Sequence, residues 1–198
     1  LAENQPEKAL VDFEKALTKK QQYADAYLEK GIALYMLKEQ TDAVNNLRKA
    51  REMGISDLKL YQYLGYAHFE IAEYDQARED LSEAIRMGLN DIRAYLYRGE
   101  IYYYAQEYEE SLKDLEKALS MGANEVKAFE LSGYAHAALG HHEEVISKLS
   151  RALEKGANKA KVYSDRGNAY FALDNHAAAV KDLETALSQG TTDVLSLY

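Results

Sequence analysis

Glycine recurs every 34 residues along this chain, in two parallel columns. Together the two columns contain ten of the eleven glycines of a 198-residue sequence. A fixed period of this length is typical of repeat proteins, in which each repeat is one small unit that stacks on the next. The first column is Gly31, Gly65, Gly99, Gly133 and Gly167, and the second is Gly54, Gly88, Gly122, Gly156 and Gly190.

Each repeat is predicted to contain two helices. Leucine and alanine recur at helical spacing before each glycine of the second column, where a glycine suits the left-handed conformation that ends a helix. The first-column glycines, with small residues such as Ala43, Ala77, Ser111 and Ala179, indicate close approach of two helices. The polar residues two positions after the second column are predicted to be the N-caps of the next helices. They are Ser56, Asn90, Asn124, Asn158 and Thr192.

The repeat resembles the tetratricopeptide repeat (TPR), a 34-residue helix–turn–helix unit. The resemblance depends on Tyr61, Gly65, Ala77, Leu81 and Ala84 with their counterparts, and on "EYDQA" and "EYEES" at the start of the second helices. Tyr or Phe replaces the tryptophan of the family, and glycine replaces its proline after the second helix. The resemblance implies an all-α fold, a right-handed α-solenoid that binds proteins along a concave groove.

The repeat also predicts how the chain is divided. We expect a single solenoid whose ends were cut from a longer array, with uncapped ends that allow self-association. The predicted segments are residues 1–20 as the second helix of a truncated repeat, five full repeats at 24–57, 58–91, 92–125, 126–159 and 160–193, and 194–198 as the start of a further helix.

Composition excludes several classes of function. The chain has 24 Lys and Arg against 33 Asp and Glu, a net charge of −9, which disfavours a nucleic-acid partner. It has no cysteine, no apolar run long enough to span a membrane and no signal peptide. A cytoplasmic protein and an extracytoplasmic part of an anchored chain both remain open. The acidic, cysteine-free composition and the glycine in place of proline suggest a bacterial origin.

Three consecutive tyrosines, Tyr102 to Tyr104, raise the question of which rings are displayed. At about 100° per residue, Tyr102 lies on the side of Gly99 and is predicted to pack in the core. Tyr103 and Tyr104 lie on the opposite arc, which the resemblance implies is the groove. Exposure is predicted for Tyr63, Tyr66, Tyr97, Tyr104 and Tyr134. A second set of rings at one repeat position is compatible with either packing or display: Tyr35, Phe69, Tyr103 and Phe171. Aromatic residues predict a ligand centred between residues 59 and 104.

The same position is basic in four successive repeats, and these residues form a basic column: Lys59, Arg93, Lys127 and Lys161. The helix dipole disfavours a cation in the first turn of a helix, so this basic column suggests a partner with acidic groups. Pairing of Lys127 with Glu130 and of Lys161 with Asp165 is the alternative. The predicted peptide- or partner-binding residues are Lys59, Tyr63, Tyr66, Arg93, Tyr97, Glu100, Tyr103, Tyr104, Lys127, Tyr134, Lys161 and Asn168.

No constellation for catalysis appears, so we predict a protein that is not an enzyme and needs no cofactor. His68 and His136 are expected to pack, and His142 and His176 lie too far apart to favour a metal site. The carboxylate clamp of some TPR domains is also absent, because Leu28, Ile32 and other residues occupy its positions. The predicted function is a non-catalytic module that binds a protein or peptide in its groove. The alternatives are a self-assembling scaffold and an accessory domain of a larger protein.

Overall fold

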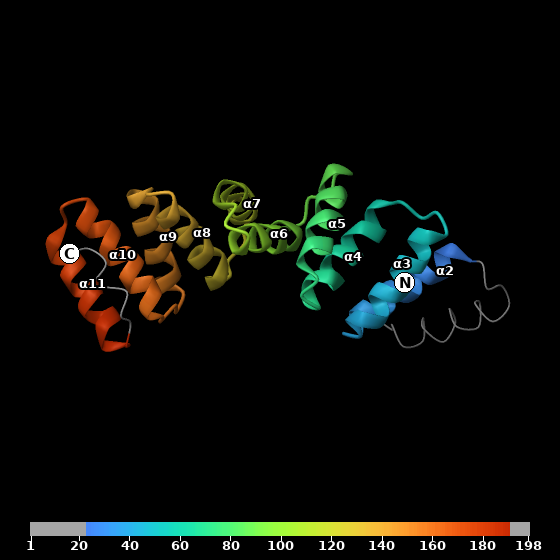
Figure 1. Cartoon of the computed structure of the whole chain (residues 1–198), viewed down its shortest axis with the longest axis horizontal. Helices are drawn as coiled ribbons and strands as arrows, with labels where there is room; N and C mark the ends of the chain where they lie inside the picture. The colour runs from blue at the N-terminus through green and yellow to red at the C-terminus, as the bar shows by residue number, and fades with distance from the viewer. Residues whose placement is uncertain (1–22, 191–198) are drawn as a thin grey trace. The chain divides into compact units, whose positions relative to one another are not determined.

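The computed structural model describes residues 23–190, which form ten α-helices and no strand (Figure 1). Each helix has 13 residues, and each begins 34 residues after its counterpart in the preceding repeat. The first helices of the repeats are α2 (Ala24–Met36), α4 (Leu58–Glu70), α6 (Ile92–Tyr104), α8 (Val126–Ala138) and α10 (Ala160–Ala172). The second helices are α3 (Gln40–Glu52), α5 (Tyr74–Arg86), α7 (Tyr108–Ser120), α9 (His142–Glu154) and α11 (His176–Ser188).

The packing of these helices confirms an all-α solenoid of helix pairs. Contacts divide the chain into two compact units, Leu1–Arg98 and Gly99–Tyr198. In the first unit α2 packs on α3, α3 on α4 and α4 on α5. In the second unit the order is α7 on α8, α8 on α9, α9 on α10 and α10 on α11. The predictions for residues 1–20, Thr192 and 194–198 lie outside the described residues.

The first glycine column lies where the two helices of a repeat approach most closely. A Cβ at Gly65 would lie 2.7 Å from both Cγ and Cδ2 of Leu81, and a Cβ at Gly133 would lie 2.3 Å from Cδ2 of Leu149. Both leucines are fully buried. The glycine of the first helix therefore leaves the space that the leucine of the second helix fills, which confirms the predicted close approach.

The second glycine column ends the second helices, as predicted. Gly88 and Gly122 both have φ of 101°, in the region that other residues rarely adopt, and no atom lies within 4 Å of a Cβ placed there. Backbone conformation, not space, requires glycine at these positions. A third column with positive φ ends the first helices, and only one of its five members is glycine. It consists of Lys38, Ala72, Gln106, Gly140 and Asp174.

The first helices begin one residue later than the sequence predicted. The residue before α4 is Asp57, whose Oδ1 accepts a hydrogen bond of 2.9 Å from the backbone N–H of Leu60. Asp91 likewise accepts a bond of 2.9 Å from the N–H of Arg93. The prediction of Ser56 and Asn90 as N-caps was wrong because the adjacent aspartate reaches the free N–H groups instead. Glu125 and Lys159 occupy the cap positions of α8 and α10 without a side-chain cap bond, so Asn124 and Asn158 are not N-caps either.

Buried polar side chains connect the two helices within a repeat. His68 is 1% exposed, and its Nδ1 lies 2.7 Å from Oδ2 of the buried Asp80. Arg166 donates from Nε and Nη2 to the two oxygens of Asp182, at 2.7 and 2.9 Å. His136 is also buried, so the prediction that His68 and His136 pack is confirmed.

Candidate binding site

The tyrosines of the first compact unit pack their rings on each other and form hydrogen bonds with nearby charged groups. Tyr35 donates a 2.7 Å hydrogen bond to Oε1 of Glu70 and accepts one of 3.1 Å from Nη1 of Arg93. Tyr66 donates to Oδ1 of Asp91 at 2.6 Å, and the Arg93 guanidinium lies 5.2 Å from the centre of its ring. These contacts form a closed network of rings, carboxylates and one guanidinium.

Tyr66 is therefore a packing residue, and the prediction that it is exposed was wrong. It is 3% exposed, because its ring lies 6.3 Å from the ring of Tyr63 and 5.7 Å from that of Tyr97. Burial, followed by the hydrogen bond to Asp91, raises its pKa above the ordinary tyrosine value. Tyr97 in turn stacks on Phe69 with ring centres 3.9 Å apart. Tyr63 and Tyr97 are half-buried rather than displayed.

The basic column is also paired within the chain. Lys59 lies 4.0 Å from Glu29, and Lys161 donates a 2.9 Å bond to Asp165, the partner that the sequence suggested. Lys127 bonds to Glu100 of α6, because the neighbouring first helix lies within reach of the lysine.

The three consecutive tyrosines differ in exposure. Tyr104 is 61% exposed, whereas Tyr102 and Tyr103 are half-buried. The ring of Tyr103 lies 5.8 Å from that of Tyr108 on α7 and 6.4 Å from that of Tyr134 on α8. Burial, followed by the charges of Tyr108 and Asp165, raises the pKa of Tyr103 to about 12. Tyr104 alone among the three is mostly displayed.

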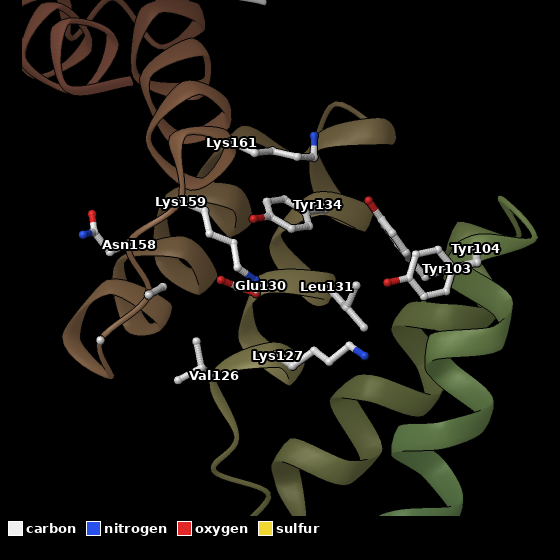
Figure 2. A pocket seen from close by; sticks show the side chains of 12 residues that line it. Tyr103, Tyr104, Val126, Lys127, Glu130, Leu131, Tyr134, Asn158, Lys159 and Lys161 are labelled. Atoms are coloured by element: carbon white, nitrogen blue, oxygen red, sulfur yellow. Dashed lines mark hydrogen bonds and ion pairs between the residues drawn. The ribbon is translucent and has the colours of Figure 1, made fainter. Parts of the chain in front are cut away.

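A pocket of about 640 Å³ opens beside Tyr103 and Tyr104, within the second compact unit (Figure 2). Its walls come from the end of α6, from α8, and from the turn that leads into α10 together with the first turn of that helix. Five of the predicted binding residues line it: Tyr103, Tyr104, Lys127, Tyr134 and Lys161. The other lining residues are Val126, Glu130, Leu131, Gly156, Ala157, Asn158 and Lys159.

Two buried polar groups at this pocket lack a partner among the described residues. Glu130 is 3% exposed; Lys159 donates a 2.6 Å bond to its Oε2, but its Oε1 has no hydrogen bond. Tyr134 is 9% exposed, and its hydroxyl has no hydrogen bond. The ammonium of Lys161 lies 4.8 Å from the centre of the Tyr134 ring. The prediction that Tyr134 is exposed was wrong, since Lys161 and Tyr103 cover its ring. Burial raises its pKa.

Among the lining residues, Glu130 was expected only as a partner of Lys127, and Lys159 was not singled out. Glu130 and Lys159 are 29 positions apart, with Glu130 on α8 and Lys159 just before α10, so their pairing gives no local signal. The only sequence signal for this pair is a cation, Lys159, one residue before α10. Asn168, a predicted site residue, does not line the pocket, although its Oδ1 is buried without a partner in the part of the chain that the structure describes.

The geometry defines a helical-repeat protein with a pocket formed mainly by its first helices. The family is then clear from comparison. Profiles described as tetratricopeptide repeat match residues 64–126, 99–160 and 160–189, and the chain belongs to this family. TPR domains are non-catalytic modules for protein–protein interaction. No curated protein shows significant similarity to the chain.

Solved structures with the same fold share little sequence with this chain. YrrB, described as a TPR protein with an unusual peptide-binding site, superposes with a TM-score of 0.74 at 21% identity, over 90% of this chain and 92% of its own. MamA MSR-1 superposes with a TM-score of 0.69 at 22% identity, over 84% of this chain and 95% of its own. Another crystal structure of MamA gives 0.67 at 18% identity, over 84% and 91%. At these identities the likeness establishes the fold.

Residues 23–190 contain neither a candidate metal site nor a candidate membrane span. No group of three or more His, Cys, Asp or Glu side chains in that range is arranged to hold a metal ion. No helix in the same range is long and apolar enough to cross a bilayer.

Proposed function

We propose that the chain binds an extended peptide segment of a partner protein in the pocket formed by α6, α8 and α10. The observation that carries this proposal is the pocket itself: an open cavity of about 640 Å³ that combines exposed aromatic surface with buried polar groups lacking partners. Ligand sites in proteins commonly pair apolar walls with a few fixed polar groups in this way. The peptide-binding site ascribed to YrrB, a protein of the same fold, is consistent with the proposal.

The location of the site differs from the one that the sequence suggested. Rings are most abundant between residues 59 and 104, but their groups already have partners within the chain. Tyr35 and Tyr66 donate hydrogen bonds to Glu70 and Asp91, and Phe69 stacks on Tyr97. A ligand in that region would have to displace contacts that already exist. In the second compact unit, Tyr104 is 61% exposed, and tyrosine offers a large contact area with few rotatable bonds. The proposed anchor is therefore Tyr104, at the edge of the pocket.

The test is selection of binders from a random dodecapeptide library displayed on phage, with the 198-residue chain as the target. A selected peptide is then measured by fluorescence anisotropy against the parent and against Tyr104→Ala combined with Lys127→Glu. The matched control combines Tyr74→Ala with Lys113→Glu, because Tyr74 is also exposed and Lys113 is an exposed lysine outside the pocket. We expect the pocket variant to lose roughly tenfold or more in affinity and the control to lose little.

Equal binding by the parent and the pocket variant would refute the proposed site. If no peptide is selected and light scattering shows a mass that rises with concentration, a self-assembling scaffold explains the chain better. Acidic peptides among the binders would support the acidic partner that the basic column suggested, at the expense of the existing pairs of Lys127 and Lys161.

A further inference from the structure

Two side chains of the pocket present unused hydrogen-bonding groups on one face of α8. Glu130 and Tyr134 are four residues apart, so their side chains lie one above the other. Figure 2 shows both among the side chains that line the pocket. Oε1 of Glu130 and the hydroxyl of Tyr134 have no partner among the described residues, although both residues are more than nine-tenths buried.

Buried polar groups in native proteins are nearly always hydrogen-bonded, to protein or to water, so these two groups are the ones with which a ligand of this pocket can bond. The hydrogen-bonding capacity of these two groups restricts that ligand. A carboxylate oxygen only accepts, while a tyrosine hydroxyl donates as well as accepts. The complementary ligand carries an N–H donor for Glu130 and an oxygen acceptor for Tyr134. A primary carboxamide carries both on one terminal group.

The charges around the pocket favour a neutral ligand group. The three lysines of the lining are each bonded to a carboxylate: Lys127 to Glu100, Lys159 to Glu130 and Lys161 to Asp165. An acidic side chain would bring its oxygens against the free oxygen of Glu130. A basic side chain would enter beside the ammonium groups of Lys159 and Lys161. A carboxamide meets neither repulsion.

The depth of the two groups favours a side chain over a peptide backbone. Because the unpaired oxygens of Glu130 and Tyr134 are themselves buried, a narrow ligand group reaches them only when an exposed covering side chain such as Lys159 or Lys161 moves aside. Val126 and Leu131 also line the cavity and would contact the methylene groups of an inserted side chain. We infer that the pocket recognises an Asn or Gln side chain on the bound peptide, with its amide N–H bonded to Glu130 Oε1 and its carbonyl oxygen bonded to the Tyr134 hydroxyl. This inference rests on the proposed function.

The experiment uses the peptide selected from the phage library, resynthesised with each Asn or Gln changed to Asp or Glu. One such change is expected to lower affinity for the parent chain roughly tenfold or more, because a hydrogen bond to a carboxylate is lost and two carboxylates are opposed. In Glu130→Gln the acidic peptide should regain affinity, since the new amide donates to the peptide carboxylate. This reversal of preference is a readout that a purely structural role for Glu130 does not produce.

Tyr134→Phe is the second variant, because it removes only the hydroxyl and keeps the ring beneath Lys161. It should weaken binding of the Asn or Gln peptide several-fold, because the carbonyl oxygen of the peptide side chain loses its donor. Lys113→Glu is the control, and it should leave both affinities unchanged.

The outcomes separate the inference from the proposed function. Selected peptides that bind through the pocket but show no preference for Asn or Gln would overturn the carboxamide inference and leave the peptide site standing. Acidic peptides preferred by the parent chain would also overturn it. Peptides insensitive to Tyr104→Ala combined with Lys127→Glu, or a selection without binders, would overturn both.

Discussion

Replacing a first-column glycine with alanine tests whether the contact between the helices of a repeat holds the array together. In Gly133→Ala the new Cβ would lie 2.3 Å from Cδ2 and 2.6 Å from Cγ of Leu149. Leu149 is fully buried, so its side chain has no free space to enter. Overpacking of this kind costs about 1–3 kcal/mol, and the helix propensity of alanine recovers about 1 kcal/mol. We expect a net loss of up to about 2 kcal/mol in the free energy of unfolding.

The chain supplies a matched control at the equivalent position of the preceding repeat. A Cβ at Gly99 would lie 3.0 Å from Cγ of Leu115, and its next neighbours lie at 3.2 and 3.3 Å. Shifts of a few tenths of an ångström relieve these contacts, and the gain in helix propensity offsets their cost. Gly99→Ala should therefore be about as stable as the parent. In a Leu149→Ala background, Gly133→Ala should stabilise the protein because the clash is absent, although Leu149→Ala alone costs about 2–5 kcal/mol.

The assay is urea denaturation followed by circular dichroism. With a slope of about 2 kcal/mol per molar urea, the expected loss in Gly133→Ala lowers the midpoint by up to roughly 1 M. Repeat arrays can unfold in parts, so hydrogen exchange should place the loss of protection in α8 and α9. Equal stability of Gly133→Ala and Gly99→Ala would refute the predicted clash with Leu149. Additive changes in the free energy of unfolding for Gly133→Ala and Leu149→Ala would refute it as well.

Two further predictions concern the backbone and the tyrosines. Ala72 has φ of 61° at the repeat position that Gly140 occupies with φ of 74°. Ala72→Gly should therefore stabilise the protein by about 0.5–1 kcal/mol, and Gly140→Ala should destabilise it by a similar amount. Urea midpoints of the two variants that do not move in opposite directions would contradict this prediction. Burial raises the pKa of Tyr66 and Tyr134 above the ordinary value near 10 and that of Tyr103 to about 12. A raised tyrosine pKa means that the fold stabilises the neutral phenol, so this contribution is complete below about pH 10 and is lost as pH rises through the folded-state pKa. An absorbance titration of the 17 tyrosines should show a late phase that coincides with unfolding, whereas a single phase at the ordinary pKa would argue against these buried environments.

The repeat architecture was predictable because its determinants are local. Both kinds of glycine act within one helix pair. Gly88 ends a helix, and Gly65 leaves space for the leucine 16 residues later. Helical spacing then places leucine and alanine on the buried face of each second helix. These constraints recur in every repeat, so the period in the sequence specifies both helices and their contact.

The candidate site was only partly predictable. Exposure of Tyr104 follows from its position on α6, and the pairing of Lys161 with Asp165 follows from helical spacing within α10. The rotation of a residue around its own helix also put Tyr66 and Tyr134 on the groove arc. It did not show that side chains from the adjacent helices would cover them.

The sequence by itself determined the fold, through contacts within single repeats that span a few turns of helix. Tertiary structure alone decided which polar groups find a partner. Glu130 bonds to Lys159 from the turn before the next repeat, and Lys127 bonds to Glu100 from the repeat before it. One pair joins α8 to α6, and the other joins α8 to the residue before α10. Their formation depends on how far each side chain reaches between these segments. The free oxygen of Glu130 and the free hydroxyl of Tyr134 are what remains after those pairs form.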